Sequence, residues 1–391
     1  MRIALVIFGD LDRPSGGYFY DYQLVSSLRE AGHEVAVVSQ PAGLSYREQR
    51  RVGRQGRRLS IDGHEVLSAG GRRGRLDRTE ALAAVRRLVE MRPDVMIIDE
   101  LNHAATTPWL PRLQAHLRST LTVGLVHHLR CDEGGIHRLA RFQEAAFLRH
   151  CDAWICNSRE TLRRVQRISG VKRSSAVAYP AGDSAGYRAG HGPRPTAKTE
   201  PVTEVSSTVP ELRVLSVGTV IPRKNLHVLL RAVAECPETD LTVVGDMETN
   251  PAYVARLREL TDELGIARRV QFRGKVPSDV LEGEYAAAHV FAAPSRYEGF
   301  GIVYLEALGR GKPVIASNAG GAPEIVRSGV DGFLVKPGAV KEVVEALKAF
   351  QTDRRRLAKM SAAARARARA FLPWHRSMAG AARFVESLVS P

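Results

Sequence analysis

The sequence has few cysteines, few aromatic residues and no long apolar run, and these shortages exclude several classes of protein. Four cysteines in 391 residues, with no Cys-x-x-Cys pair, do not make a disulfide framework. The twelve histidines show no zinc-ligand spacing. No stretch approaches the roughly 18 apolar residues of a membrane-spanning helix, and the first apolar run is too short for a secretory signal. We therefore expect a folded, cytoplasmic protein.

Acidic residues are also scarce relative to basic ones, since 42 Asp and Glu face 57 Lys and Arg, a net charge of +15. Such an excess favours an anionic partner: nucleic acid, a membrane surface or a phosphorylated substrate. Much of it is arginine in the segments 46–60, 70–78 and 354–371, which a solvated basic face explains equally well. These segments lack interleaved aromatic residues, so we disfavour nucleic acid. A peripheral contact with the anionic inner face of a membrane stays open.

Apolar strand candidates alternate with helical segments along both halves of the chain. In the first half, segments 2–8, 33–39 and 94–99 are rich in Val, Ile and Leu, and helix-period segments such as 78–92 separate them. This pattern indicates a parallel sheet covered on both faces. The same alternation restarts near residue 211. Because 391 residues exceed what one hydrophobic core usually supports, the sequence predicts two doubly wound α/β domains.

Between the two halves the chain is rich in Pro, Gly, Ser and Thr and poor in apolar residues, so this stretch cannot fold alone. The predicted organisation is an N-terminal domain at 1–180, a linker at 181–210, a C-terminal domain at 211–372 and a final helix at 373–391. That helix packs either on its own domain or back on the N-terminal domain. Two facing domains of this kind would place a ligand cleft at the carboxyl ends of both sheets.

The segment RYEGFGIVYLEAL, at 296–308, places two glutamates around a glycine-rich turn that leads into a helix. The amides of residues 301–303 would point at one spot, with the positive end of the helix dipole behind them, and this suits a phosphate. Glu298 lies before the helix and Glu306 lies inside it, so the two carboxylates can contact different parts of one long ligand. By themselves they are better explained as a cap residue and an exposed helix charge.

The wider segment PSRYEGFGIVYLEALGRGKPVIASNAGGAPEIV, at 294–326, resembles the signature of the family 4 retaining glycosyltransferases, also called glycosyl transferases group 1. Further similar segments occur in the expected order: GGYFYDYQLVSSLREAGHEVAVVS, CDAWICNS, VLSVGTVIPRKN, TVVGD and the final helix with its tryptophan. The resemblance extends over most of the chain. It implies the GT-B fold, with two Rossmann-like domains facing across a cleft, and a nucleotide-diphosphate sugar as donor.

The resemblance also implies a role for each matching residue. Glu298 would hydrogen-bond the hydroxyls of the donor sugar, and Glu306 the ribose. Lys224 would neutralise the diphosphate as its charge grows during bond breaking. The family commonly has an arginine where this chain has Thr219, and Arg223 is the candidate replacement. The other candidate donor-binding residues are Gly16 and Gly17 in the loop after the first strand, Gly218 after a later strand, and Gly299, Phe300, Gly301, Ile302 and Val303 around the helix start.

The strand LTVGLVHH ends in His127 and His128. A histidine at a strand end is more often structural, but the family has one near this place that contacts the donor sugar, and His127 fits it better. Asp10 and Asp12 form an Asp-x-Asp pattern, which another glycosyltransferase fold uses to hold a divalent metal. Because the pattern is short and lies where a GT-B loop is expected, we predict no metal and no cofactor.

The predicted activity is transfer of a hexose from a UDP- or GDP-linked sugar to an acceptor hydroxyl, and the resemblance implies retention at the anomeric carbon. The acceptor would be a sugar, a small metabolite or a lipid-linked molecule. Two other classes stay open: a nucleotide-sugar epimerase of the same fold, and a basic protein that binds nucleic acid or a membrane surface. A fold match by itself does not distinguish between these functions.

Overall fold

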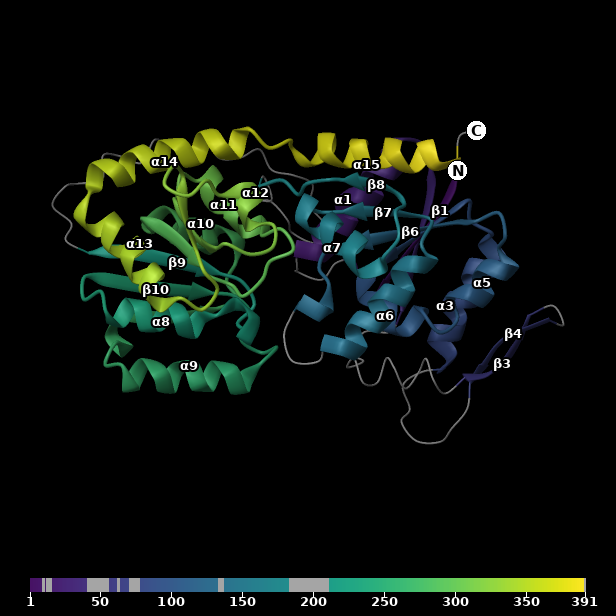
Figure 1. Ribbon diagram of the computed structural model, residues 1–391, viewed down its shortest axis with the longest axis horizontal. Helices are drawn as coiled ribbons and strands as arrows, with labels where there is room; N and C mark the ends of the chain where they lie inside the picture. Colours follow the sequence, from purple (N-terminus) through teal and green to yellow (C-terminus); the bar gives the residue numbers. More distant parts are fainter. Residues whose placement is uncertain are drawn as a thin grey trace. The chain divides into compact units, whose positions relative to one another are not determined.

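The computed structural model describes residues 1–8, 11, 16–40, 56–61, 64–69, 78–132, 137–182 and 211–389. These residues form two compact units, one made of residues 1–179 and 374–391 and the other of residues 180–373 (Figure 1). Most of the predicted linker, 183–210, lies outside the described residues, as do Asp10, Asp12 and much of the arginine-rich segment 46–78.

In the N-terminal unit, six described strands form one parallel sheet in the order β2-β1-β5-β6-β7-β8. All five residues of β5 are buried, as expected where helices cover both faces of a parallel sheet. The predicted doubly wound arrangement is confirmed here. The strands are β1 (Arg2–Phe8), β2 (Glu34–Gln40), β5 (Val95–Asp99), β6 (Leu121–Val126), β7 (Ala153–Cys156) and β8 (Ser174–Val177).

The helices of this unit follow the signals expected at helix ends. In α7 (Arg159–Ser169), the Ser158 hydroxyl accepts the Thr161 amide at 3.0 Å, and Gly170 ends the helix at a φ of 70°. The last helix, α15 (Trp374–Val389), packs on α1 (Gly16–Glu30), where the Phe19 and Trp374 rings meet edge to face at 5.1 Å. The other helices are α3 (Arg78–Met91), η1 (Glu100–Asn102), α4 (His103–Thr106), α5 (Leu110–His116), η2 (Arg130–Asp132) and α6 (His137–His150).

A feature that we did not predict is an antiparallel hairpin of β3 (Gly56–Ile61) and β4 (His64–Ala69). It lies within the arginine-rich segment, which had no assigned structure. The sequence does carry a signal for it, because Asp62 and Gly63 separate the two short runs and Asp-Gly is typical of two-residue hairpin loops.

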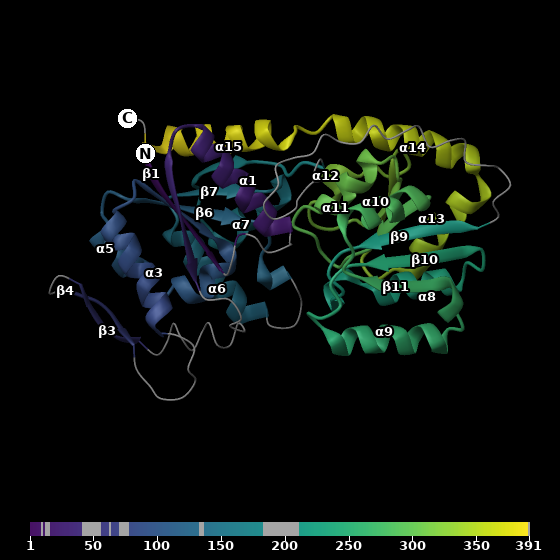
Figure 2. The same cartoon turned by 180° about the vertical axis from the view of Figure 1, so that it is seen from behind.

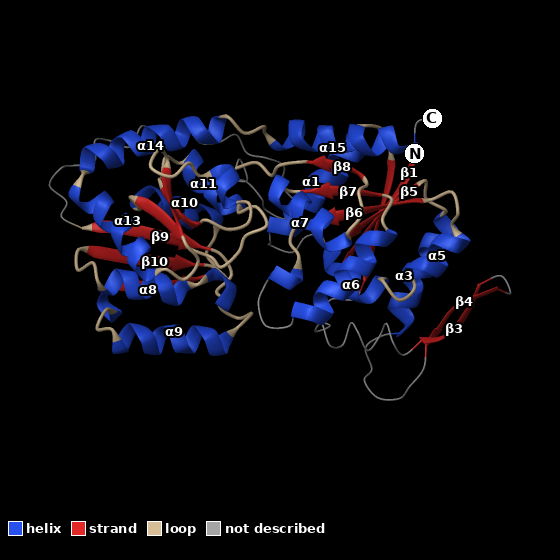
Figure 3. Ribbon diagram, viewed as in Figure 1, coloured by secondary structure: helices blue, strands red, loops and turns tan. Residues whose placement is uncertain are grey.

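The C-terminal unit also has one parallel sheet of six described strands, in the order β11-β10-β9-β12-β13-β14. Figure 3 shows these strands gathered between helices. The chain runs outward from β9 to β11 and then returns to the other side of β9, so the switch point lies between β9 and β12. The strands are β9 (Leu212–Val217), β10 (Thr239–Val244), β11 (Val270–Gly274), β12 (Val290–Ala293), β13 (Val314–Ser317) and β14 (Gly332–Val335).

Helices cover both faces of this second sheet and enclose a hydrophobic core that is separate from the core of the N-terminal unit. Figures 1 and 2 show α8 and α11 on opposite sides of the strands. The helices are η3 (Pro222–Lys224), α8 (Leu226–Ala234), α9 (Pro251–Glu263), η4 (Ala267–Arg269), α10 (Ser278–Ala287), α11 (Ile302–Gly309), α12 (Ala322–Ile325), α13 (Val340–Thr352) and α14 (Arg354–Arg369). No helix among the described residues is long and apolar enough to cross a membrane.

The arginine-rich segment 354–371 is in part structural. The Arg367 guanidinium donates to the carbonyl oxygens of Glu324 and Ile325 at 2.6 and 2.8 Å and so fastens α14 to α12. Arg356 lies over the Phe333 ring, 5.1 Å from its centroid. A solvated basic face therefore explains only some of these arginines, such as the exposed Arg355 and Arg369.

Candidate functional site

The C-terminal unit joins two of the predicted catalytic residues in an ion pair. Lys224 ends η3, the turn that follows β9, and Glu298 lies in the loop that follows β12. Their side chains meet at 2.6 Å, Nζ to Oε1, and each is only about a tenth to a sixth exposed, at 15% and 10%. Since β9 and β12 flank the switch point, the fold brings these residues together across 74 positions of sequence.

Arg223 also contacts Glu298. Its Nη1 donates to the Tyr297 carbonyl at 2.9 Å and to Oε2 of Glu298 at 3.3 Å, so both carboxylate oxygens of Glu298 face a cation. The Arg223 carbonyl accepts the Arg296 amide at 2.8 Å, which ties the two loops together through the backbone. Arg223 therefore supplies positive charge beside Glu298 in a chain that has Thr219 where the family commonly has arginine.

The ionisation of Glu298 follows from these neighbours. Burial alone would raise the pKa of its carboxyl, but Lys224 and then Arg223 lower that pKa to about 2. The Ser295 hydroxyl adds a hydrogen bond to Oε1 at 2.7 Å. Glu298 is thus a fully ionised, hydrogen-bond-accepting group at neutral pH, and it does not cap α11, since the cap position is held by Gly301.

Two glycines allow close packing around the loop that carries Glu298. Gly320 has a φ of 62°, and a Cβ there would overlap the Glu298 carbonyl oxygen. Gly301 has a φ of 100°, and a Cβ there would overlap the Tyr304 ring, which is buried. Gly218 is near the cation, because a Cβ on it would stand 3.7 Å from Lys224 Nζ. A side chain at the first two positions would displace the loop that carries Glu298.

The amides at the start of α11 are available to a ligand. Among the described residues from Gly301 onward, the first amide with a backbone acceptor is that of Tyr304, which bonds the Gly301 carbonyl at 2.9 Å. Gly301, Ile302 and Val303 are partly exposed, whereas Gly299 and Phe300 are buried beneath them. Free amides at a helix start attract anions. This predicted phosphate-binding turn comes shortly after Glu298, which contacts Lys224 and Arg223 in the same unit.

Glu306 lies one turn further along α11 and is partly exposed. The Tyr285 hydroxyl donates to its Oε2 at 3.3 Å. Tyr285 is itself buried, and the Arg310 guanidinium lies over its ring, 4.5 Å from the centroid. Burial, and then the charge of Glu306, raise the pKa of Tyr285 well above its usual value, so its hydroxyl stays a donor.

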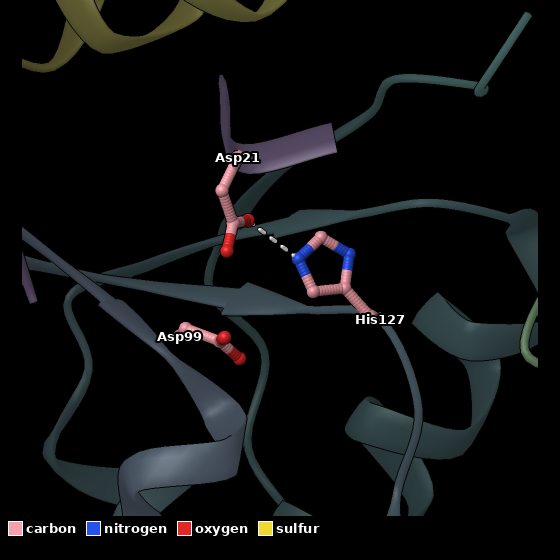
Figure 4. Close-up of side chains that lie close together, drawn as sticks. All are labelled: Asp21, Asp99 and His127. Carbon is pink, nitrogen blue, oxygen red and sulfur yellow. Dashed lines mark hydrogen bonds and ion pairs between the residues drawn. The ribbon is translucent and has the colours of Figure 1, made fainter. Parts of the chain in front are cut away.

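In the N-terminal unit, His127 follows β6 and is buried among acidic side chains (Figure 4). Its Nε2 lies 2.8 Å from Oδ1 of Asp21, which projects from α1 and is fully buried. Asp99, at the end of β5, lies below the pair in Figure 4. Asp21, Asp99 and His127 each offer one atom within 4.8 Å of the others. These residues come from the carboxyl ends of strands and from the helix after β1.

Two acids at this place, Asp99 and its neighbour Glu100, have raised pKa values. Burial, with the charge of Asp21 next, raises the pKa of Asp99 to about 6. Burial and the charge of Asp99 raise the pKa of Glu100 well above its usual value. Two carboxylates and an imidazole could also ligate a divalent metal, but Asp21 and His127 are already hydrogen-bonded to each other. The cluster therefore does not require a metal, and the absence of a metal stays a prediction.

The position of Gly16 and Gly17 differs from our expectation. We placed them in the loop after the first strand, but they form the first turn of α1. The first amides of a helix need no intrahelical acceptor, so glycine can stand there at little cost to the helix while the backbone stays open to a ligand. Gly16 is exposed and Gly17 partly exposed.

Sequence reasoning missed the partners of the predicted residues. Ser295 was inside a segment we singled out, but a serine in a loop carries little signal. Asp21 carried a clearer sequence signal, because it lies on the buried face of α1 with Leu24, Val25 and Leu28. An acid on the apolar face of a helix must have a buried partner. The sequence does not say which partner.

Two family descriptions match the chain. Residues 16–182 match the glycosyl transferase 4-like domain, and residues 204–367 match glycosyl transferases group 1. The chain belongs to the GT-B glycosyltransferases of the family 4 type. The candidate residues of this glycosyltransferase lie within the two matched ranges.

Curated relatives of the glycosyltransferase are similar over part of their length. A GDP-mannose-dependent alpha-(1-6)-phosphatidylinositol monomannoside mannosyltransferase of Mycolicibacterium smegmatis is 37% identical over 163 residues, 39% of this chain and 42% of the relative. A D-inositol 3-phosphate glycosyltransferase of Nocardia farcinica is 34% identical over 236 residues, 58% of this chain and 51% of the relative. The chain thus matches about half the length of these relatives or less.

Solved structures with the same fold match the glycosyltransferase from end to end. Sucrose-phosphate synthase from Thermosynechococcus elongatus has a TM-score of 0.73 at 21% identity, covering 99% of this chain and 98% of that one. Anabaena HepE in complex with UDP-glucose has a TM-score of 0.72 at 19% identity, with both chains covered completely, at 100%. At such identities the likeness shows the fold alone, and it confirms the predicted GT-B architecture.

Proposed function

We propose that this glycosyltransferase moves a hexose from a UDP- or GDP-linked sugar to an acceptor hydroxyl, with retention at the anomeric carbon and without a metal ion. The observation that carries the proposal is the contact of Lys224 and Arg223 with buried Glu298, beside the free amides that begin α11. Cations and helix amides bind a diphosphate, while an ionised carboxylate binds sugar hydroxyls. A nucleotide-diphosphate sugar combines both groups in one molecule.

Each residue would then act on a particular part of the donor. Lys224, Arg223 and the amides of residues 301–303 would hold the diphosphate and stabilise its growing charge. Glu298 would accept hydrogen bonds from the sugar, and Glu306 would accept them from the ribose. Donor and acceptor would be held for reaction on one face of the sugar.

No residue in these motifs is an evident covalent nucleophile, so we favour direct same-face attack. The acceptor oxygen bonds to the anomeric carbon while the bond from that carbon to the diphosphate oxygen breaks. The acceptor proton passes to the departing phosphate, and the bonding electrons stay on the diphosphate. The step needs no oxidant, no reductant and no metal.

Similarity to named relatives narrows the choice of substrates for a first assay. One relative is named as GDP-mannose-dependent with a phosphatidylinositol monomannoside acceptor, and another is named for D-inositol 3-phosphate. The solved complex of Anabaena HepE contains UDP-glucose. GDP-mannose and UDP-glucose are therefore the first donors to test, and phosphorylated or lipid-linked inositols are the first acceptors.

Binding can be tested before an acceptor is known. A thermal-shift panel of UDP, GDP, ADP and their sugars should give one nucleotide family that raises the melting temperature, because a ligand of the native state stabilises it. Lys224→Ala should abolish that shift and leave the unliganded protein folded. A panel in which no nucleotide raises the melting temperature of the wild type would count against the proposal.

Transfer is tested with the donor that binds. Donor consumption should yield a glycosylated acceptor with the anomeric configuration of the donor, and EDTA should not reduce the rate. Consumption of donor without a transferred product would select the epimerase alternative. A rate that disappears in EDTA and returns with a divalent metal would refute the metal-free mechanism.

A further inference from the structure

The ring of His127 is held by two adjacent residues of α1. Asp21 Oδ1 is 2.8 Å from Nε2, and the Tyr20 ring meets the imidazole edge to face, with centroids 4.8 Å apart. Tyr20 is itself fixed, since its hydroxyl donates to the Ala178 carbonyl at 2.8 Å. The hydrogen bond to Asp21 and the ring contact with Tyr20 therefore fix the orientation of the imidazole.

The backbone of His127 is held from the sheet side. Its amide donates to Oε2 of Glu100 at 2.9 Å, and its carbonyl accepts from Nδ2 of Asn157 at 2.8 Å. Asn157 in turn accepts the Thr161 hydroxyl at 3.0 Å. Most hydrogen-bonding groups of His127 thus have a protein partner, and all of these partners are buried.

The remaining group is Nδ1. Within the described part of the chain, the hydrogen bond to Asp21 is the one that the imidazole makes, and it uses Nε2. Nδ1 is therefore the ring nitrogen left to meet a ligand. Whether Nδ1 donates or accepts depends on the protonation state, because a neutral ring with hydrogen on Nε2 has a bare Nδ1, whereas the imidazolium carries hydrogen on both nitrogens.

We propose that Asp21 is a positioning residue for His127, taking the hydrogen of Nε2 so that the ring presents Nδ1 to a bound substrate. This inference rests on the proposed function. It assigns to α1 a second use, since the helix begins at Gly16 and Gly17 and carries Asp21 little more than one turn later. The role is indirect, because Asp21 acts through the imidazole.

The charges around His127 favour the cationic ring. Burial would lower the pKa of His127, but the charge and hydrogen bond of Asp21, followed by the charge of Asp99, outweigh burial and raise that pKa. The arrangement resembles the general case in which a buried aspartate fixes the tautomer and orientation of a histidine. The titratable groups around His127 are Asp21 and Tyr20 from α1, Asp99 at the end of β5, and Glu100, which accepts the His127 amide.

The hydrogen bond can be tested without any activity assay. In the full chain labelled with 15N-histidine, His127 should show a hydrogen on Nε2 at every pH at which the protein is folded, and this needs no variant. In Asp21→Asn, which keeps the shape but not the charge, the proton affinity of His127 should fall about tenfold or more. The matched control is Asp152→Asn, because the Asp152 carboxylate accepts the Thr122 amide at the other end of β6. It should leave the titration unchanged.

Kinetics test whether the hydrogen bond between Asp21 and His127 contributes to the reaction. Asp21→Asn should lower kcat by about ten- to a hundredfold, and the loss of activity at high pH should begin at lower pH than in the wild type. Nucleotide binding in the thermal-shift assay should stay at wild-type strength, since its partners lie in the C-terminal unit. Asp152→Asn should keep the wild-type kcat.

Three outcomes would overturn the inference. The first is an unchanged His127 titration in Asp21→Asn, and the second is a shifted titration with unchanged kcat and pH profile. The third is loss of the Nε2 hydrogen on adding zinc or manganese together with activity that EDTA removes, which would make the cluster a metal site. If the wild type transfers nothing from any donor, the proposed function fails, while the titration still reports separately on the hydrogen bond.

Discussion

The two units bury carboxylates in opposite electrostatic settings. In the C-terminal unit, Glu298 meets two cations, and its pKa falls to about 2. In the N-terminal unit, Asp21, Asp99 and Glu100 surround one imidazole, and the pKa of Asp99 rises to about 6. The first setting is charged at any physiological pH and suits an anionic ligand. In the second, burial and neighbouring acids raise the pKa of Asp99, so a shared topology gives two electrostatically different sites.

The largest effect is expected where the cationic setting is broken. Lys224→Met should lower kcat by about 10²–10³-fold, because the diphosphate loses a charge that stabilises its departure. It should also lower the free energy of unfolding by about 3 kcal/mol, since buried Glu298 loses its nearer partner. Steady-state kinetics and denaturant unfolding measure the two effects.

Lys275→Met is the matched control for Lys224. Lys275 pairs with Asp246 at 2.9 Å but is 55% exposed, so solvent screens the pair and it contributes little to stability. The control should retain wild-type kcat and nearly wild-type stability. Equal losses in both variants would mean that the difference in burial between the two pairs has no functional meaning.

The second prediction concerns how the stability contributed by Glu298 depends on pH. The pKa of Glu298 is lower in the folded state than its usual 4.5, so its contribution to stability is complete above pH 4.5 and is lost as the pH falls towards 2. The contribution is about 3 kcal/mol. Glu298→Gln should lose it at neutral pH and show a flatter stability profile between pH 4.5 and 2, measured by denaturant unfolding and by hydrogen exchange of the β9 and β12 amides.

Glu282→Gln serves as the control for this titration. Glu282 pairs with Arg310 and is about half exposed, at 46%. Glu282→Gln should leave the acid limb of the stability curve, the loss of stability between pH 4.5 and 2, in place. If the acid limb persists in Glu298→Gln and disappears in Glu282→Gln, the assignment of the limb to the buried site is wrong.

How far the sequence could predict these regions depends on the kind of signal. The strands were recoverable because a parallel strand is an apolar run; the predicted first strand, 2–8, coincides with β1. The helix start at α11 was recoverable because the glycine-rich turn at 299–301 precedes it, and Gly301 adopts a positive φ there. Glu298 and Lys224 were assigned to one site through the family resemblance, and the structure brings them into contact.

Partners within a buried cluster were not recoverable in the same way. His127 and Asp21 are 106 positions apart, and their contact depends on the order of strands in the sheet and on the return of α1 across it. Periodicity fixes which face of α1 is buried but not what that face meets. The same limit applies to Tyr285 and Glu306, where two helices must pack in one particular register.

A smaller effect on stability is expected when one of the buried acids beside His127 is removed. The pKa of Asp99 and of Glu100 is higher in the folded state than in the unfolded chain, so the N-terminal unit gains stability as the pH falls from about 6 towards 4. Glu100→Gln keeps an oxygen for the His127 amide and removes one buried acid. It should raise the free energy of unfolding at pH 7 by about 1 kcal/mol.

The gain from Glu100→Gln should vanish at pH 4, where both carboxyls are protonated in the wild type. Hydrogen exchange of the β1 and β5 amides, corrected for intrinsic rates, measures it at both values of pH. A variant that is less stable at pH 7 and equally so at pH 4 would show that the acids are not protonated as their burial implies. The C-terminal variants should show the opposite pH trend.

The smallest effect concerns how far the cation-rich site extends along α11. Tyr285→Phe removes only the hydroxyl that donates to Glu306 at 3.3 Å, and Arg310 still covers the ring. Because one hydrogen bond of this kind is worth roughly 0.5–1.5 kcal/mol, the donor KM should rise by about two- to tenfold while kcat stays unchanged. A nucleoside diphosphate without ribose hydroxyls provides the control, since Glu306 would have nothing to hold in it. Wild type and Tyr285→Phe should bind that compound equally; a difference that persists would place the tyrosine's influence on the diphosphate rather than on the ribose.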